Sequence, residues 1–450
     1  MVDSPQARVL YYTWGEEMAD VRPFKGLRYN TQIVGELSPV ICPPFDTIPP
    51  ELQRSLYQRS PYNVVRLESG ERLPADTLQD NRYTRAAALL ADWMGKQVLA
   101  RDGEPAFYLV RHAFSFRGRE RGRLELMACV RLEEYQSRVV LPHEYTRDAD
   151  KRDRLALMEA CRANFSPIMC LYRDEDRRLY SIFQRTMAGP PTIDFSDPAE
   201  QSYRVWRIDE KRRTNEIREA MASKPLYIAD GHHRYETALT YRDLMRVAQG
   251  GAQAGETASN FVMMGLIAFD DPGLMVLPYH RVLGGLDATT LGQVRNGLKE
   301  FFDAGPARAC PEFTEGAWLR AFLEEIELRG RDQLVMGLLD SIGNYQLLTL
   351  KQGFSLDAWG PIAHSEAWIL EEQMLKPILG DSLDRYLTYV HDGGEAEQKV
   401  RSGEYQMGFF MKPFPLGLFE TIMNMGRRLP PKSTFFYPKL PTGLVINLLF

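Results

Sequence analysis

The densest group of chemically useful side chains lies in the segment PLYIADGHHRYETALTYRD, in the middle of the chain. Its apolar run predicts a short buried strand that ends at Asp230, and Gly231 permits a tight turn directly after the strand. The spacing that follows predicts a helix beginning with His232, His233 and Arg234. The first N–H groups of a helix are unpaired and lie at the positive end of its dipole, so this segment favours an anion, most naturally a phosphate. The Arg234 guanidinium adds a fork of donors that matches phosphate oxygens, and the imidazoles can donate to the same group.

The same segment has a purely structural interpretation. Asp230 would cap the helix and the two histidines would lie on its polar face, while Ala238, Tyr241 and Met245 form the buried stripe. The chain has only seven histidines, so two in succession are an unusual way to build a solvated face. A metal pair is disfavoured because adjacent helical positions point about 100° apart and do not chelate one ion.

A second candidate is the proline-rich stretch SPVICPPFDTIPP at residues 38–50, which predicts a stiff loop that presents Asp46 and Thr47. A carboxylate on a rigid loop suits a general base or a magnesium ligand. The alternative is that Asp46 is a turn or N-cap residue before a helix at 51–59. The residues alone leave both interpretations open.

A third candidate is the polar loop LPHEYTRDADKRDR, which places His143 beside Glu144. A carboxylate next to an imidazole can act as a general acid or base, and the surrounding arginines and lysine could meet phosphates. The alternative for these basic residues is a solvated, salt-bridged loop that leads into a helix. His143 and Glu144 are therefore better candidates than the charges around them.

Two further segments carry weaker signals. In LPYHRV, a predicted strand ends with His280 and Arg281, which either add a second phosphate contact or form a pair facing water. Near the C-terminus, PPKSTFFYPK places Lys432, Ser433 and Thr434 among aromatic residues. This segment lacks the spacing of a Walker loop, but its basic and hydroxyl side chains make it a candidate to reach the site.

The elements that must position these residues alternate between strands and helices along the chain. The pattern predicts a hairpin over 106–116 and 123–132, a strand at 62–67, and paired strands at 261–269 and 274–279. Helices and strands continue to alternate after about residue 286. We therefore expect an α+β protein with an N-terminal extension at 1–20, a core at 21–285, and a C-terminal α/β lobe at 286–450 that packs on the core.

Composition excludes several classes of function. The chain has 450 residues and a formal charge of −5, so it lacks the basic field that non-specific nucleic-acid binding needs. Hydrophobic residues make up 44% and charged residues 26%, as in an ordinary globular protein, and no segment is apolar for long enough to span a bilayer. The first residues lack a secretory signal pattern, so a cytoplasmic location is expected. Five scattered cysteines without a C-x-x-C pair predict neither a disulfide framework nor a thiolate zinc site.

These motifs together resemble a known family. The segments PFKGLRY, CPPFDTI, LPHEYT, ADGHHRYETAL, LPYHR and KSTFFYPKLPTGL are similar to those of the bacterial family called domain of unknown function 1015. Within it, Gly231 and Arg234 resemble the G-x-x-R core that grips a nucleotide phosphate in the ParB/sulfiredoxin-like fold, and D-G-H-H-R is similar to a segment of free-serine kinases. Two positions depart from relatives in this fold: Thr237 replaces the alanine of the ParB box, and His232 replaces the cysteine of sulfiredoxin. The latter excludes sulfiredoxin's thiol chemistry.

The resemblance implies a ParB/sulfiredoxin-like core and a phosphotransferase that uses Mg²⁺ with ATP or ADP on a small hydroxylated metabolite, free L-serine being the first candidate. The turn at 230–234 would hold the transferable phosphate, with His232 also polarising it. Glu144, or else Asp46, would accept the proton of the substrate hydroxyl. The alternatives are a non-catalytic nucleotide-binding regulatory protein and a phosphatase that uses the same site. The expected partners are a nucleotide and a small molecule rather than nucleic acid or membrane, and a homo-oligomer stays open.

Overall fold

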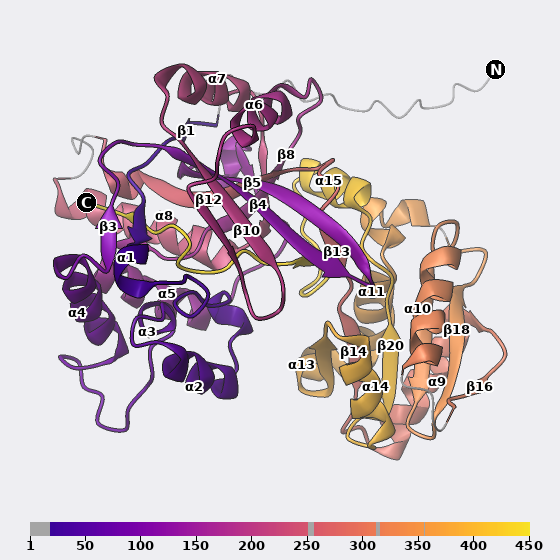
Figure 1. The fold of residues 1–450 in the computed structure, drawn as a ribbon. Helices are drawn as coiled ribbons and strands as arrows, with labels where there is room; N and C mark the ends of the chain where they lie inside the picture. The colour runs from indigo at the N-terminus through magenta and orange to yellow at the C-terminus, as the bar shows by residue number, and fades with distance from the viewer. Residues whose placement is uncertain (1–18, 251–255, 312–315, 355) are drawn as a thin grey trace. The chain divides into compact units, whose positions relative to one another are not determined.

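The computed structural model describes residues 19–250, 256–311, 316–354 and 356–450 (Figure 1). The chain divides into two compact units. Unit 1 comprises residues 1–141, 148–268 and 441–450, and unit 2 comprises residues 142–147 and 269–440. The domain boundaries expected from the sequence remain predictions. The two units are defined by their internal contacts, and independent folding is a separate property. Most of the expected N-terminal extension, residues 1–18, lies outside the described residues.

A nine-stranded mixed sheet forms the centre of unit 1. Its order is β6-β11-β8-β12-β5-β4-β10-β9, and β1 pairs with β5. The pairs β6–β11 and β8–β12 are parallel, whereas the others are antiparallel. The strands are β1 Val21–Arg22, β4 Phe107–Phe116, β5 Arg119–Arg131, β6 Val140–Leu141, β8 Ile168–Tyr172, β9 Ile193–Ser196, β10 Ser202–Ile208, β11 Leu226–Asp230 and β12 Phe261–Ala268.

The helices of unit 1 pack into two apolar clusters. One cluster joins one face of the sheet to α6, α7 and α8, and the other gathers α2, α3 and α4 around Trp93. Helix α5 contributes to both clusters, through Met158 to the first and through Leu157 and Cys161 to the second. The helical elements are α1 Thr31–Val34, η1 Phe45–Thr47, α2 Pro50–Arg59, α3 Val65–Glu68, α4 Arg82–Gly95, η2 Tyr135–Ser137, α5 Asp148–Cys161, α6 Arg178–Met187, α7 Lys211–Met221, α8 His232–Ala248 and η4 Ala258–Asn260.

The last ten residues of the chain belong to unit 1, where Ile446 and Leu448 lie in the second cluster and Leu449 in the first. Strand β22 (Asn447–Leu448) pairs with β7 (Ala163–Asn164), and β2 (Leu27–Tyr29) pairs with β3 (Leu99–Arg101). Ile446, which is fully buried, exchanges backbone hydrogen bonds of 2.8 and 2.9 Å with Leu27. The C-terminal segment is therefore a structural part of the unit that contains the N-terminal strands.

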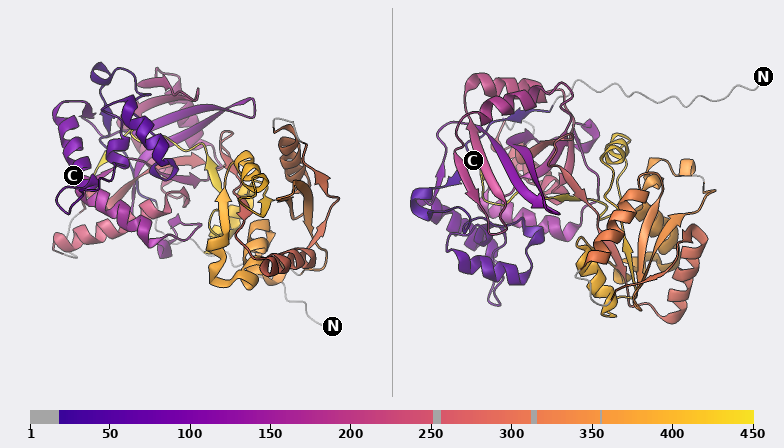
Figure 2. Two further views of the ribbon diagram at one scale, coloured as in Figure 1. Left: turned by 90° about the horizontal axis from the view of Figure 1, so that it is seen from below. Right: turned by 45° about the vertical axis from the view of Figure 1, so that its right-hand side comes forward.

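Unit 2 is a sheet covered by helices on both faces (Figure 2). Its seven-stranded sheet has the order β15-β18-β17-β20-β14-β19, with β16 beside β18. Alternate side chains of the strands face α9 and η7 on one side and α10 and α14 on the other. The strands are β13 Met275–Leu277, β14 His280–Leu283, β15 Phe302–Ala304, β16 Arg308–Ala309, β17 Val335–Asp340, β18 Asn344–Leu350, β19 Leu387–Val390, β20 Met407–Phe410 and β21 Phe435–Tyr437, of which β13 and β21 form a separate pair. The helical elements are α9 Ala288–Phe301, α10 Ala317–Arg329, η5 Leu356–Ala358, η6 Pro361–His364, α11 Glu366–Trp368, the π-helix η7 Ile369–Leu375, α12 Lys376–Leu379, η8 Gly380–Ser382, α13 Leu383–Tyr386, α14 Gly393–Arg401 and α15 Leu416–Asn424.

The α+β class expected from the sequence is confirmed, as are the hairpin β4–β5 and the strand–turn–helix of β11 and α8. Two expectations are wrong. The apolar run at 62–67 leads into helix α3 rather than forming a strand, because a short apolar run fits a buried helical turn equally well. Strand β12 pairs with β5 and β8, and β13 pairs with β21, so the segments around 261–269 and 274–279 do not pair with each other. The described helices include none that is long and apolar enough to cross a membrane.

The buried C-terminal segment predicts a strong mutational effect. Ile446→Ala is expected to lower the free energy of unfolding by about 2–5 kcal/mol, because it opens a cavity where the side chain is completely enclosed. Phe450→Ala, four residues further on and at a position that is 52% exposed, is the control and should cost less than about 1 kcal/mol. Urea unfolding of both variants checks this, and equal small losses would show that the segment is not part of the core.

Candidate functional site

The turn between β11 and α8 has the geometry expected from the sequence. Gly231 has a φ of 98° and separates β11 from α8, a helix of 17 residues. Gly231 is the N-cap residue of α8 and, as a glycine, has no side chain with which to cap the helix. The pairing of β11 with β8 shifts register between Ile228 and Asp230, so an irregularity lies directly before the turn. The first N–H groups of α8 therefore carry the positive end of the helix dipole at a bulged strand end, a common setting for functional sites.

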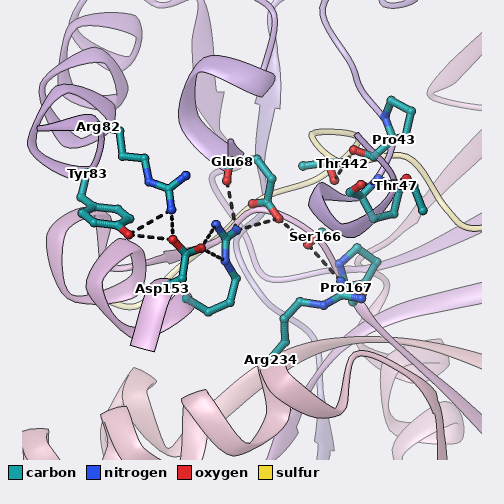
Figure 3. Close-up of polar contacts among 12 residues, drawn as sticks. Pro43, Thr47, Glu68, Arg82, Tyr83, Asp153, Ser166, Pro167, Arg234 and Thr442 are labelled. Carbon is teal, nitrogen blue, oxygen red and sulfur yellow. Dashed lines mark hydrogen bonds and ion pairs between the residues drawn. The ribbon is translucent and has the colours of Figure 1, made fainter. Parts of the chain in front are cut away.

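The Arg234 side chain folds back over this turn (Figure 3). Its Nη2 donates to Asp230 Oδ2 at 2.7 Å, and its Nη1 donates to Ser166 Oγ at 3.0 Å and to the carbonyl of Pro167 at 2.6 Å. A Cβ at Gly231 would lie 2.9 Å from Nη2, so glycine is required both for its φ and for this close approach. Both Nη atoms thus clasp β11 to the start of β8, whereas the buried Nε of Arg234 has no hydrogen-bond partner among the described residues.

A buried carboxylate lies beside this clasp. Glu68, the last residue of α3, is 4% exposed, and its Oε1 accepts a hydrogen bond from Ser166 Oγ at 3.1 Å. Arg154 on α5 donates from Nη1 to the Glu68 carbonyl at 3.0 Å and lies 3.6 Å from Oε1. Burial raises the pKa of the Glu68 carboxyl, although the guanidiniums of Arg154 and Arg234 act to lower it. The carboxylate is therefore held at a cost in desolvation.

These groups line a small cavity within unit 1. Its volume is about 40 Å³, and its polar lining consists of Glu68, Arg154, Asn164, Ser166 and Arg234. A cavity of this size holds a few water molecules but not a nucleotide. The cavity, whose lining also includes apolar residues such as Leu157 and Val262, is thus too small to be the nucleotide site itself.

The proline-rich loop also approaches this cluster. Its η1 turn places the Phe45 ring 4.1 Å from the centre of the Arg154 guanidinium, and the neighbouring Asp46 is exposed. The negative charge of Asp46 acts to raise the pKa of Glu68, so the two carboxylates lie in the same region of unit 1. The structure therefore brings together the Asp46 loop and the turn at Gly231, two motifs that are almost 200 residues apart in the chain.

The two histidines after Gly231 have different environments. His232 is 1% exposed, so the alternative in which both histidines lie on a solvated face is wrong for this residue. His233 is half-buried, and its Nε2 lies 3.5 Å from Asp150 Oδ2 on α5. Ala238 is buried in the apolar cluster, as expected from the helical spacing.

The remaining predicted site residues belong to unit 2. His143 is buried, its Nε2 lies 3.0 Å from Thr434 Oγ1, and its ring packs edge-on against Phe419. The carbonyl of the next residue, Glu144, accepts from Arg428 at 3.0 Å. The structure thus joins the LPHEYT loop to the KSTFF segment within one unit.

Other side chains of these unit 2 segments are held internally. Ser433 Oγ donates to the Pro430 carbonyl at 2.8 Å, and Lys432 Nζ lies 5.4 Å from the centre of the Tyr279 ring. The Ser433 hydroxyl is thus turned toward the backbone of its own segment, and the Lys432 ammonium group toward an aromatic ring elsewhere in unit 2. Their role in binding phosphate stays a prediction.

His280 and Arg281 do not form a pair facing water, as one alternative held, because they are 2% and 1% exposed. His280 Nδ1 accepts from the Met411 N–H at 3.2 Å. Arg281 donates from Nε to Glu371 Oε1 at 2.8 Å, and Tyr389 donates to the other oxygen of Glu371 at 2.9 Å. Because Glu371 already neutralises the guanidinium, phosphate binding by Arg281 stays a prediction that would require breaking a buried ion pair.

Sequence reasoning did not identify Glu68 and Ser166, and it gave Arg154 only as one of several basic residues that either meet phosphates or belong to a solvated loop. The only signal for Glu68 was a carboxylate at the end of the apolar run VVRL, which is weak by itself. Arg154 is 6% exposed and is also paired with Asp153, so it is a buried residue rather than part of a solvated loop. Within the described residues, no group of three or more His, Cys, Asp or Glu side chains forms a metal site.

Residues 21–383 match the family described as "Protein of unknown function (DUF1015)". The match covers most of the chain, so the chain belongs to this family, as the sequence motifs indicated. No curated protein matches the chain.

Several solved structures are similar to the chain at low identity. A conserved hypothetical protein from Pyrococcus furiosus is 13% identical, with a TM-score of 0.34 over 69% of this chain and 94% of the other. A free serine kinase in complex with AMP is 13% identical, with a TM-score of 0.32 over 68% of this chain and 88% of the other. SbnI from Staphylococcus aureus, with a C-terminal truncation, is 9% identical, with a TM-score of 0.35 over 72% and 87%.

The packing of Arg234 against Gly231 gives a testable prediction. Gly231→Ala and Gly316→Ala both place Ala at the N-cap of a helix in the left-handed region, with φ of 98° and 66°, and each should lose about 1–2 kcal/mol of unfolding free energy for that reason. At Gly316 the new Cβ meets no atom of the described residues within 4 Å, whereas at Gly231 it displaces the guanidinium. Gly231→Ala should therefore lose at least about 1 kcal/mol more in chemical denaturation. Equal losses would mean that Arg234 moves aside without cost and is not a clasp.

Proposed function

We propose that the chain is a nucleotide-dependent phosphotransferase with a ParB/sulfiredoxin-like core, acting on a small hydroxylated metabolite, with free L-serine as the first candidate. The observation that carries this proposal is the start of α8 directly after the left-handed Gly231, with the buried Arg234 guanidinium folded over that glycine. Backbone donors, a helix dipole and a guanidinium at one glycine turn are the groups that phosphate binding requires.

In this proposal the turn at 230–234 binds the transferable phosphate. The N–H groups at the start of α8 and the Arg234 Nε–H would donate to its oxygens, and His232 and His233 would supply further donors. The three hydrogen bonds of the Arg234 Nη atoms fix the position of the guanidinium before any ligand arrives. Phosphoryl transfer depends mainly on such positioning and on charge stabilisation.

The proton acceptor is one of two carboxylates. Asp46 is exposed, lies on a loop stiffened by prolines and belongs to the same unit as the turn. Glu144 belongs to unit 2 and stands beside the buried His143. Mg²⁺ bound with ATP or ADP would neutralise phosphate charge, and a single carboxylate such as Asp46 suits this ion, which keeps most of its waters. Asp46 therefore serves either as base or as metal ligand, and Glu144 takes the base role in the second case.

A non-catalytic nucleotide-binding protein is the second candidate. It is favoured by the hydrogen bonds of Arg234, which connect the turn to the residues just before β8. A ligand that displaces the guanidinium would therefore also shift the start of β8. Turnover distinguishes this candidate from the phosphotransferase.

The phosphotransferase proposal predicts a separation of turnover from binding. Asp46→Asn or Glu144→Gln should lower kcat by roughly 10²-fold or more and leave ADP affinity within a few-fold, because a general base acts on the acceptor hydroxyl. The assay measures phosphorylated product from ATP or ADP with Mg²⁺ and a panel of hydroxylated acceptors that includes L-serine. Glu51→Gln removes an exposed carboxylate near the same loop and is the control.

Two outcomes would contradict the proposal. If both carboxylate variants keep wild-type turnover, this mechanism is wrong. If the wild-type protein binds nucleotide but forms no product with any acceptor, the regulatory protein is the better description.

A further inference from the structure

We propose that Glu68 is a positioning residue of the phosphate turn, which holds the Arg234 guanidinium in place through the hydroxyl of Ser166. The inference deepens the proposed function and rests on it, since it assigns a role to a residue that contacts the turn only through others. The contacts that carry it are Glu68 Oε1 to Ser166 Oγ at 3.1 Å and Ser166 Oγ to Arg234 Nη1 at 3.0 Å.

The chemistry of the three groups fixes the direction of both hydrogen bonds. A guanidinium has donors only, so Ser166 must accept from Arg234. The single hydroxyl proton of Ser166 is then available for Glu68, which accepts it as a carboxylate. The result is a hydrogen-bond series in which Arg234 donates to Ser166 and Ser166 donates to Glu68, so the direction of each bond is fixed. A charged acceptor at its end strengthens both bonds.

Stability does not explain why a carboxylate occupies this position. Glu68 and Arg154 are 4% and 6% exposed, and their closest charged atoms are 3.6 Å apart, which is long for an ion pair that must offset burial. Asp153, which also pairs with Arg82, takes the shorter contact to Arg154. Neutral side chains of similar size would fill the space at a lower desolvation cost. We therefore attribute the negative charge of Glu68 to its role in the hydrogen bonds that join Ser166 to Arg234, at the edge of the cavity.

The groups that face Glu68 come from every element around it. Arg154 on α5 and Arg234 on α8 act to lower its pKa, whereas Asp46 on η1 acts to raise it, and burial has the largest effect and also raises it. The buried thiols of Cys42 and Cys161 also interact with it. The net pKa lies above the ordinary value of 4.5. As the pH falls through this raised pKa, Glu68 takes up a proton, and the hydrogen-bond series loses its charged acceptor.

Ionisation of Glu68, which supports the hydrogen bonds to Arg234, has the opposite effect on the stability of the fold. Because the folded state binds this proton more tightly than the unfolded state, ionisation of Glu68 lowers the free energy of unfolding as the pH rises through the window. A neutral isostere should therefore not lower the melting temperature at neutral pH. Loss of binding without loss of stability is the signature of a positioning role.

The test measures ADP and inorganic phosphate binding by calorimetry for the wild-type protein and for Glu68→Gln, Ser166→Ala and Glu159→Gln. Glu68→Gln and Ser166→Ala are each expected to weaken binding at pH 7.5 roughly tenfold, with the melting temperature of Glu68→Gln unchanged or raised. Glu159 is an exposed carboxylate on α5, so Glu159→Gln controls for the loss of one charge and should bind like the wild type. As the pH is lowered toward 5, the affinity of the wild-type protein should fall relative to that of Glu68→Gln measured at the same pH, because protonation of the phosphate ligand itself affects both proteins alike. Unchanged affinity in Glu68→Gln, or a loss only in that variant and not in Ser166→Ala, would overturn the proposal.

A ligand-free measurement separates this inference from the proposed function. If the wild-type protein binds neither ADP nor phosphate, the proposed function fails, and amide hydrogen exchange then tests Glu68 alone. Peptides that cover residues 228–238 should exchange faster in Glu68→Gln than in Glu159→Gln, because the guanidinium that holds the turn is less firmly placed. Equal exchange in the two variants would contradict the positioning role.

Discussion

The three-point attachment of the Arg234 guanidinium is the interaction on which the site depends. Its Nη atoms bind an aspartate at the end of β11 and a hydroxyl and a carbonyl at the start of β8, so it joins two adjacent strand ends. Because the side chain must pass over the turn to do this, position 231 has to be glycine. The turn, the buried Nε and the N-terminus of α8 are thereby fixed relative to one another before any ligand binds. Such preorganisation is what charge stabilisation in phosphoryl transfer requires.

The C-terminal segment connects the loops and strand ends that surround this site. Thr442 exchanges backbone hydrogen bonds with Cys42 in the proline-rich loop, and Gly443 donates to the carbonyl of Phe165 just before β8. A Cβ at Gly443 would lie 2.9 Å from Val64, next to the start of α3. Residues 442–443 therefore touch all three segments that supply the carboxylates and the hydroxyl of the site. This explains why a segment so far along the chain is buried within unit 1.

The sequence was sufficient where the signal is local. An apolar run followed by a glycine and a helical pattern predicted β11, the turn and α8, and a glycine- and arginine-rich turn between two apolar runs predicted β4 and β5. It was insufficient where tertiary partners decide. Glu68 is defined as a site residue by contacts with residues 86 and 98 positions further along the chain. Likewise, the sequence suggested that the guanidinium of Arg234 was available for a ligand, but it donates three hydrogen bonds, to Ser166 and Pro167 just before β8 and to Asp230 at the end of β11.

The most direct test of the account is a calorimetric titration of ADP with Mg²⁺ into the wild-type protein and into Arg234→Lys. Lysine keeps the positive charge, but one ammonium cannot span the acceptors on two strands and also reach the turn. We expect measurable binding to the wild-type protein and an affinity at least roughly tenfold lower for Arg234→Lys, with circular dichroism showing that the variant remains folded. Equal affinities for the two proteins, or no binding to a folded wild-type protein, would contradict it.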